Sequence, residues 1–255
     1  MNDTRTESDS FGPIEVPAEA LWGAQTARSL RFFAIGAQRM PLPVIHALAW
    51  VKWAAARVNL ELDLVDAAKA HAIADAAQRV AEGEFDREFP LSVWQTGSGT
   101  QSHMNVNEVL ARLATAALPE GHRISPHDDV NVGQSSNDVF PTAMHIAVAQ
   151  QARAVLWPAL AGLRTALSAK ADEFGAVVKI GRTHLQDATP VTLGQEFGGY
   201  EAQLALCQSQ LEQSLAAVHT LAIGGTAVGT GLNTHPEFGA RVAALLSRQL
   251  GLPLV

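Results

Sequence analysis

Three polar segments rich in glycine, serine and threonine stand out in this sequence of 255 residues, because each of them interrupts a helical pattern. They read TGSGTQS at 96–102, GQSSND at 133–138 and GRTHLQDATP at 181–190, and a helical pattern follows each one. A helix start offers free backbone N–H groups and the positive end of the helix dipole, which suits a carboxylate. One such segment alone would indicate only a helix boundary, since the same residue types are common N-caps. Three in one chain favour an anion site that they build jointly.

His184, in the third segment, is the candidate for proton transfer. A lone histidine is more often a structural, hydrogen-bonded residue than a catalyst, and that alternative stays open. Its neighbours Thr183 and Asp187 can orient the ring, and the ordinary pKa of histidine suits proton transfer near neutral pH. The sequence therefore predicts an acid–base role for His184.

No motif for a metal or a cofactor accompanies these segments. His122, His127, Asp128 and Asp129 lie close in sequence, but they lack an HExxH motif or another fixed ligand spacing. The stretch GGTAVGTGLN at 224–233 lacks the lysine of a phosphate-binding loop, and it predicts a tight turn where two backbone segments approach closely. We therefore expect no metal site and no bound cofactor.

The elements that must position these groups are helical. Helices are expected over 44–62, from the N-cap Asp66 to about Gly83, over 101–118, over 138–174 and over 192–222. Pro158 should disturb the fourth helix because it lacks a backbone donor. The first 41 residues look irregular, and among the rest only 177–183 has an extended character. These patterns predict an all-α fold.

Apolar positions in 192–222 recur with a period near 3.5, from Leu193 and Phe197 through Leu204 and Leu211 to Val218. That period is typical of a seam between long packed helices. A rod of 31 residues spans roughly 45 Å, which is longer than this chain can cover by itself. We therefore expect the helix to pack against other subunits, with a long helix in a monomeric bundle as the alternative.

The composition narrows the classes of function. The formal net charge is −7 and 47% of the residues are hydrophobic, as in an ordinary globular protein. No stripe of lysine and arginine suggests nucleic-acid binding, and no apolar run reaches the ~18 residues of a membrane span. The single cysteine, Cys207, cannot form an internal disulfide, and it fits a reducing cytoplasm.

Several longer segments carry a family resemblance. They are IEVPAEALWGAQTARS, WQTGSGTQSHMNVNEV, DDVNVGQSSNDVFPTAMHIA, KIGRTHLQDATPVTLGQEF and GGTAVGTGLNTHPEF. Together they resemble the signature regions of class II fumarases, in the fumarase/aspartase superfamily, over essentially the whole chain. The resemblance implies an N-terminal lyase domain at 1–137, the first part of a central helical bundle at 138–255, and a homotetramer whose active sites draw on three subunits. The implied reaction is the reversible, metal-free hydration of fumarate, a small dicarboxylate, to (S)-malate.

The resemblance also implies roles for individual residues. Ser98, Thr100, Ser135, Ser136, Asn137 and Thr183 correspond to substrate contacts, and His184 corresponds to the histidine that exchanges a proton through a water. Ser125, Pro126, His127 and Asp128 correspond to a secondary anion site, where the family usually has His-Pro-Asn-Asp.

Two further departures bear on function. His103 stands where the family usually has asparagine, and the chain ends at Val255, before the loop that supplies the serine base and a substrate-binding lysine in the family. Aspartate ammonia-lyase is the nearest alternative, but its pattern has glutamine at the position of His184. A catalytically inactive helical oligomer is the alternative from another class.

Overall fold

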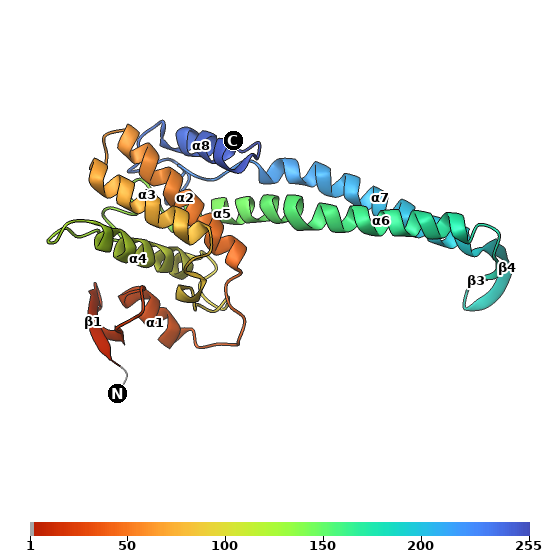
Figure 1. The fold of residues 1–255 in the computed structure, drawn as a ribbon, viewed down its shortest axis with the longest axis horizontal. Coiled ribbons are helices and arrows are strands. Elements are labelled where there is room, and N and C mark those ends of the chain that lie inside the picture. The colour runs from red at the N-terminus through yellow and green to blue at the C-terminus, as the bar shows by residue number, and fades with distance from the viewer. Residues whose placement is uncertain (1–2) are drawn as a thin grey trace. The chain divides into compact units, whose positions relative to one another are not determined.

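The computed structural model describes residues 3–255, and it is mostly helical, as the sequence predicted (Figure 1). The strands are β1 (Thr4–Asp9), β2 (Gly12–Pro17), β3 (Val178–Thr183) and β4 (Gln186–Thr192). The helices are α1 (Ala24–Phe32), α2 (Leu42–Glu61), α3 (Ala67–Ala81), α4 (Thr100–Ala117), α5 (Ser136–Gln151), α6 (Trp157–Glu173), α7 (Leu193–Val218) and α8 (Phe238–Leu250), with a 3₁₀ turn, η1, at Asp86–Glu88 and a π-helical turn, η2, at Ala152–Leu156.

The chain divides into two compact units. Unit 1 contains the chain up to Ala147 together with His219–Val255, and unit 2 contains Val148–Val218. This division reflects contacts within the chain. The domain boundary at 137/138 concerns the longer proteins of the family and stays a prediction.

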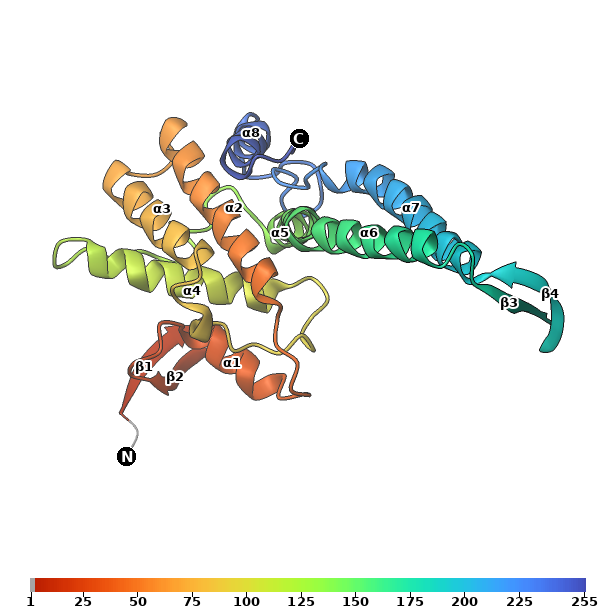
Figure 2. The same ribbon diagram turned by 45° about the vertical axis from the view of Figure 1, so that its right-hand side comes forward.

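Helix α2 forms the centre of unit 1, where it packs against α3, α4 and α8 (Figure 2). Its alanine-rich sequence is buried on all sides, with Ala47, Leu48 and Ala49 fully buried in succession. Helix α3 begins where predicted, because the Asp66 carboxylate accepts hydrogen bonds from the backbone N–H groups of Ala68 and Lys69 at 2.9 and 3.3 Å.

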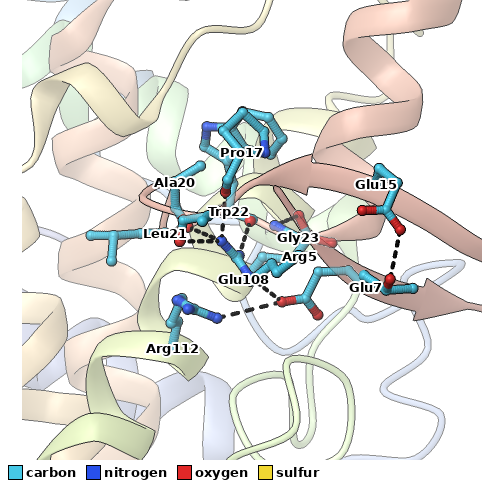
Figure 3. Close-up of polar contacts among 12 residues, drawn as sticks. Arg5, Glu7, Glu15, Pro17, Ala20, Leu21, Trp22, Gly23, Glu108 and Arg112 are labelled. Carbon is cyan, nitrogen blue, oxygen red and sulfur yellow. Dashed lines mark hydrogen bonds and ion pairs between the residues drawn. The ribbon is translucent and has the colours of Figure 1, made fainter. Parts of the chain in front are cut away.

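The expectation of an irregular N-terminus was wrong, because residues 4–17 form the antiparallel hairpin β1–β2. The hairpin gave no signal in the sequence since its strands are mostly polar, and only Val16 is buried. Arg5 ties the hairpin to the segment that follows it. Its guanidinium group donates to the carbonyl oxygens of Pro17, Ala18, Ala20 and Trp22 at 2.7–3.0 Å, as Figure 3 shows for three of them.

Unit 2 consists of α6 and α7 side by side, joined by the hairpin β3–β4 (Figures 1 and 2). The helix expected over 138–174 is interrupted by the π-helical turn η2, directly before Pro158 in the first turn of α6. The cause is that Pro158 has no N–H to continue the regular ladder of hydrogen bonds.

The α6–α7 pair has hardly any buried side chains of its own. No residue of α6 is buried and only Gly194 of α7 is. Exposed apolar side chains include Leu163, Leu206 and Leu211. The 26 residues of α7 form a rod of about 39 Å, which is shorter than expected. Its apolar seam is only partly covered, because Leu211 is exposed and Leu193, Phe197, Leu204 and Val218 are half-buried. Within residues 3–255, no helix combines the length and the apolar character that crossing a membrane requires.

Candidate functional site

The first polar segment forms the start of α4. Gly99 is its N-cap residue with φ of 70°, and a Cβ atom there would lie 2.2–2.4 Å from the ring of Phe140, so only glycine fits. The hydroxyl groups of Thr96, Ser98 and Thr100 form a chain, with oxygen–oxygen distances of 3.1 and 3.0 Å. Thr96 donates its hydroxyl hydrogen to Gln101 Oε1 at 2.7 Å, whereas Ser98 and Thr100 can turn their hydrogens toward an added anion.

The second polar segment forms the start of α5 through a capping box. The Ser135 backbone N–H donates to the Asp138 carboxylate at 2.9 Å, and the Ser135 hydroxyl accepts from the Asn137 backbone N–H at 3.2 Å. Ser135 is therefore an N-cap, as the simpler interpretation of this segment holds. Its hydroxyl hydrogen remains available for another acceptor.

Asp138 also connects α5 to the glycine-rich stretch 224–233. Its second carboxylate oxygen accepts from the backbone N–H groups of Gly224 and Thr226, both at 3.0 Å. A Cβ atom on Gly224 would lie 2.7 Å from the Cα atom of Gly239 in α8. The close backbone approach predicted for this stretch is therefore present.

These two helix starts meet in unit 1. The hydroxyl oxygens of Thr100 and Ser136 lie 2.8 Å apart, although 36 residues separate them in sequence. Thr100 and Ser136 are partly exposed, whereas Ser98 and Asn137 are exposed. The Asn137 side chain lies beside them and donates to the Ala227 carbonyl oxygen at 2.8 Å. We call Ser98, Thr100, Ser135, Ser136 and Asn137 the hydroxyl–amide cluster. It offers neutral donors at two positive helix ends, an arrangement suited to a carboxylate.

The third polar segment differs from the expectation, because it does not lie at a helix start. Residues 181–190 lie within the hairpin β3–β4, and α7 begins only at Leu193. His184 and Leu185 are the two turn residues between the paired Thr183 and Gln186, with φ of 53° and 60°. Positive φ at both positions corresponds to a type I′ turn, which normally carries asparagine and glycine.

His184 is exposed at the tip of this turn in unit 2. Asp187 does not orient its ring, as we had expected, but faces Arg182 across the hairpin with 3.4 Å between their charged atoms. Alternation of side chains along the strands explains this, because Arg182 and Asp187 are paired residues of neighbouring strands. Thr183 and His184 thus lie in the other unit from the hydroxyl–amide cluster.

The residues of the predicted secondary anion site form a compact loop in unit 1. The Ser125 hydroxyl donates to the Asp128 carboxylate at 2.9 Å and accepts from the Asp128 backbone N–H at 3.0 Å. The ring of His127 lies 2.6 Å from the side-chain amide of Gln25. Ser125, Pro126 and His127 line a cavity of about 660 Å³, which Arg112 also lines.

Glu108 lies in the wall of the same cavity, and no local motif indicated its role. Its carboxylate accepts from the backbone N–H groups of Gly23, Gln25 and Thr26 and from the Thr26 hydroxyl, at 2.6–3.1 Å, and so caps the start of α1. Figure 3 shows Glu108 beside Gly23. Burial raises the pKa of Glu108, and these hydrogen bonds oppose that rise.

No group of three or more histidine, cysteine, aspartate and glutamate side chains in residues 3–255 is arranged to hold a metal ion.

The comparison with known families decides the family of this chain. A family model described as lyase matches residues 12–255, which include all three polar segments. The chain belongs to this lyase family.

Its relatives within the lyase family include proteins called class II fumarate hydratase. The one from Bordetella parapertussis is 58% identical over 256 residues, which cover 99% of this chain and 55% of the relative. The one from Methylorubrum extorquens is 60% identical over 256 residues, covering 98% and 54%. A crystal structure of class II fumarase from Schistosoma mansoni is similar to the fold, with a TM-score of 0.92 and 43% identity, covering 98% of this chain and 53% of that one.

These findings confirm the resemblance to class II fumarases. They also show that the chain spans about half the length of the curated relatives it matches.

Proposed function

We propose that this chain, as part of a protein of its relatives' length, acts as a fumarate hydratase that interconverts fumarate and (S)-malate. The observation that carries the proposal is the junction of the α4 and α5 starts, where the hydroxyl oxygens of Thr100 and Ser136 lie 2.8 Å apart. The similarity to class II fumarate hydratases supports the same reaction.

The chemistry explains why neutral donors suit this reaction. Removing a proton from the carbon next to a carboxylate creates a doubly charged aci-carboxylate, and aimed hydroxyl and amide donors stabilise that charge. In this proposal Ser98, Thr100, Ser136 and Asn137 bind a substrate carboxylate. Ser135 contributes its free hydroxyl hydrogen while it caps α5. The two helix dipoles add to the attraction.

His184 is the proposed proton carrier, acting with a water, and Thr183 is a further substrate contact. The exposed position of His184 at the hairpin tip supports this role, because its ring is open to a substrate or a water. Anti elimination requires the acid and the base on opposite faces of the substrate. In the family the base is a serine in a loop beyond the part of the protein that this chain matches.

We also propose a homotetramer in the cytoplasm. The uncovered apolar side chains of α6 and α7 support association with further helices, and the free, exposed Cys207 supports a reducing compartment. At the secondary anion site we propose weak binding at most, because the Ser125 hydroxyl is already engaged by Asp128.

The alternative reaction within the family is aspartate ammonia-lyase, and co-substrate choice separates the two. The test uses this chain completed with the remaining C-terminal part of the Bordetella parapertussis relative, which we call the completed enzyme. Loss of fumarate absorbance is followed with water alone and with added ammonium. We expect malate formation and no acceleration by ammonium. Faster turnover with ammonium would favour the ammonia-lyase, and an assembled protein inactive with both would favour a non-catalytic helical oligomer.

A further inference from the structure

Lys52, in the middle of α2, is a fully buried lysine without a place in the proposed reaction. Its Nζ atom lies 2.6 Å from His103 Nε2, 3.0 Å from Asn131 Oδ1 and 2.9 Å from Gln134 Oε1. An ammonium group has three hydrogens to donate, and here it meets two amide oxygens and a ring nitrogen that accepts when His103 carries its proton on Nδ1. A buried cation is retained only where such partners satisfy it.

The three partners fit a charged Lys52 and a neutral His103. Burial lowers the pKa of Lys52 well below its usual value, whereas the Asp138 carboxylate raises it. In either protonation state Lys52 has hydrogens for both amide oxygens, because a neutral amine would donate to these two and accept from a His103 Nε2–H. Burial and the nearby Lys52 charge lower the pKa of His103 as well. Its Nε2 atom can therefore accept the hydrogen bond from Lys52.

The side-chain amides of Asn131 and Gln134 connect Lys52 to the backbone by hydrogen bonds. With its oxygen toward Lys52, Gln134 donates through Nε2 to the carbonyl oxygens of Val130 and Val132, both at 3.1 Å. Asn131 donates through Nδ2 to the Gln134 carbonyl oxygen at 3.3 Å. Rotating either amide by 180° would direct its NH₂ group at the ammonium, so Lys52 fixes both orientations.

The segment held in this way directly precedes the hydroxyl–amide cluster. Residues 131–134 form a turn, closed by a backbone hydrogen bond of 3.2 Å from Gln134 to Asn131, with Gly133 at φ of 70°. A Cβ atom on Gly133 would lie 2.8 Å from the Thr234 hydroxyl, so this turn also has little space to shift. Ser135, the N-cap of α5, is the next residue.

We propose that Lys52 is a positioning residue for the carboxylate site: its buried ammonium orients Asn131 and Gln134, which fix the turn that presents Ser135, Ser136 and Asn137. The inference rests on the proposed function, because it assigns Lys52 to that same site. His103, which replaces the asparagine usual in the family, is the third partner of the ammonium.

The test compares Lys52→Met with Lys69→Met in the completed enzyme. Lys69 is the matched control, because its ammonium binds Asp129, which precedes the same turn, at 2.7 Å. Lys52→Met should raise KM for fumarate about tenfold, the scale of one charge-assisted hydrogen bond, with kcat changed less than about threefold. Lys69→Met should leave both constants near those of the unsubstituted enzyme.

A double-mutant cycle and a milder variant complete the test. If Lys52 acts through Asn137 and its neighbours, Lys52→Met combined with Asn137→Ala should raise KM by less than the product of the single effects. Where Lys52→Met does not assemble, Gln134→Leu removes one link at a partly exposed position and should raise KM in the same direction. An unchanged KM in the folded variant, or a fall in kcat alone, overturns the positioning role. The unsubstituted completed enzyme reports separately on the proposed function, because its inactivity with fumarate would refute the reaction.

Discussion

Thr100 and Ser136 in unit 1 lie on helix starts backed by buried residues, whereas His184 in unit 2 lies at the exposed turn of a two-stranded hairpin. Behind the first pair, Asp138 is buried and holds three backbone N–H groups. Around His184, the neighbouring ion pair of Arg182 and Asp187 is itself exposed, at 63% and 73% of the side chains.

The contrast indicates that the two regions hold their polar side chains in different ways, one on packed helix starts and the other on an exposed turn. The hydroxyl–amide cluster has its geometry fixed by contacts within this chain, so it is pre-organised for the carboxylate that we propose it binds. The hairpin tip holds strained positive φ angles at His184 and Leu185, and His184 is exposed there. Unit 1 should therefore tolerate loss of the remaining protein better than unit 2.

The largest expected effect concerns residues 1–255 alone. They should show no hydratase activity, because the serine base of the family lies beyond the matched part, and the open apolar side chains of α6 and α7 should make them aggregate. Co-refolding with a separately made C-terminal part of the Bordetella parapertussis relative should restore malate formation. Activity of residues 1–255 alone would refute this division of labour, and a monodisperse, well-folded monomer would refute the packing argument.

His184→Asn separates proton transfer from binding. In the completed enzyme it should lower kcat by about 10²-fold or more, the usual scale for losing a general acid–base group. Thr100→Ala and Asn137→Ala should instead lower kcat/KM, because they remove contacts made in both the ground state and the transition state. Steady-state rates of fumarate hydration decide this. A near-normal kcat for His184→Asn would make the histidine structural.

Gly99→Ala tests how tightly the hydroxyl–amide cluster of unit 1 is packed. The added Cβ atom would meet the Phe140 ring at 2.2–2.4 Å, and alanine would also have to adopt φ of 70°. We expect a loss of about 2 kcal/mol of stability, from the left-handed conformation and the overpacking together. Gly97→Ala, two residues earlier, is the matched control because no atom lies within 4 Å of the added Cβ. Equal melting temperatures for the two variants would contradict the close packing of the two helix starts.

The sequence predicted the helices and helix starts of unit 1 better than it predicted the two hairpins. Helix periodicity and the N-caps revealed α2–α4 and the two converging helix starts, because those signals are local. The hairpins were missed or only partly recognised, since β1 and β2 have no apolar alternation and His184-Leu185 is an unusual pair for a type I′ turn. The buried partners Lys52 and Glu108 were missed because their roles depend on residues more than 50 positions away.

The smallest expected effect is the pH dependence of stability that two glutamates, one in each unit, contribute. Glu108 of unit 1 has its pKa raised by burial, whereas hydrogen bonds from Lys179 and Tyr200 lower the pKa of Glu196 in unit 2. The stability that the raised pKa of Glu108 contributes is present below about pH 4.5, its ordinary value, and is lost as pH rises through the folded pKa. The contribution of Glu196 has the opposite sign: it is present above about pH 4.5 and is lost as pH falls through its lowered pKa.

Glu108→Gln and Glu196→Gln remove these two ionisations one at a time. The melting temperature of Glu108→Gln, minus that of the unsubstituted completed enzyme, should increase as pH rises above about 4.5. The reason is that the variant no longer has a buried carboxyl group to ionise. The same difference for Glu196→Gln should decrease as pH rises toward about 4.5. The decrease should be small, because solvent screens an exposed ion pair. Thermal unfolding measured from about pH 3 to about pH 8 compares the two trends, because the Glu196 effect lies below about pH 4.5. Trends of the same sign would mean that Glu108 is solvated like a surface carboxylate, and that the α1 cap is not part of the buried framework of unit 1.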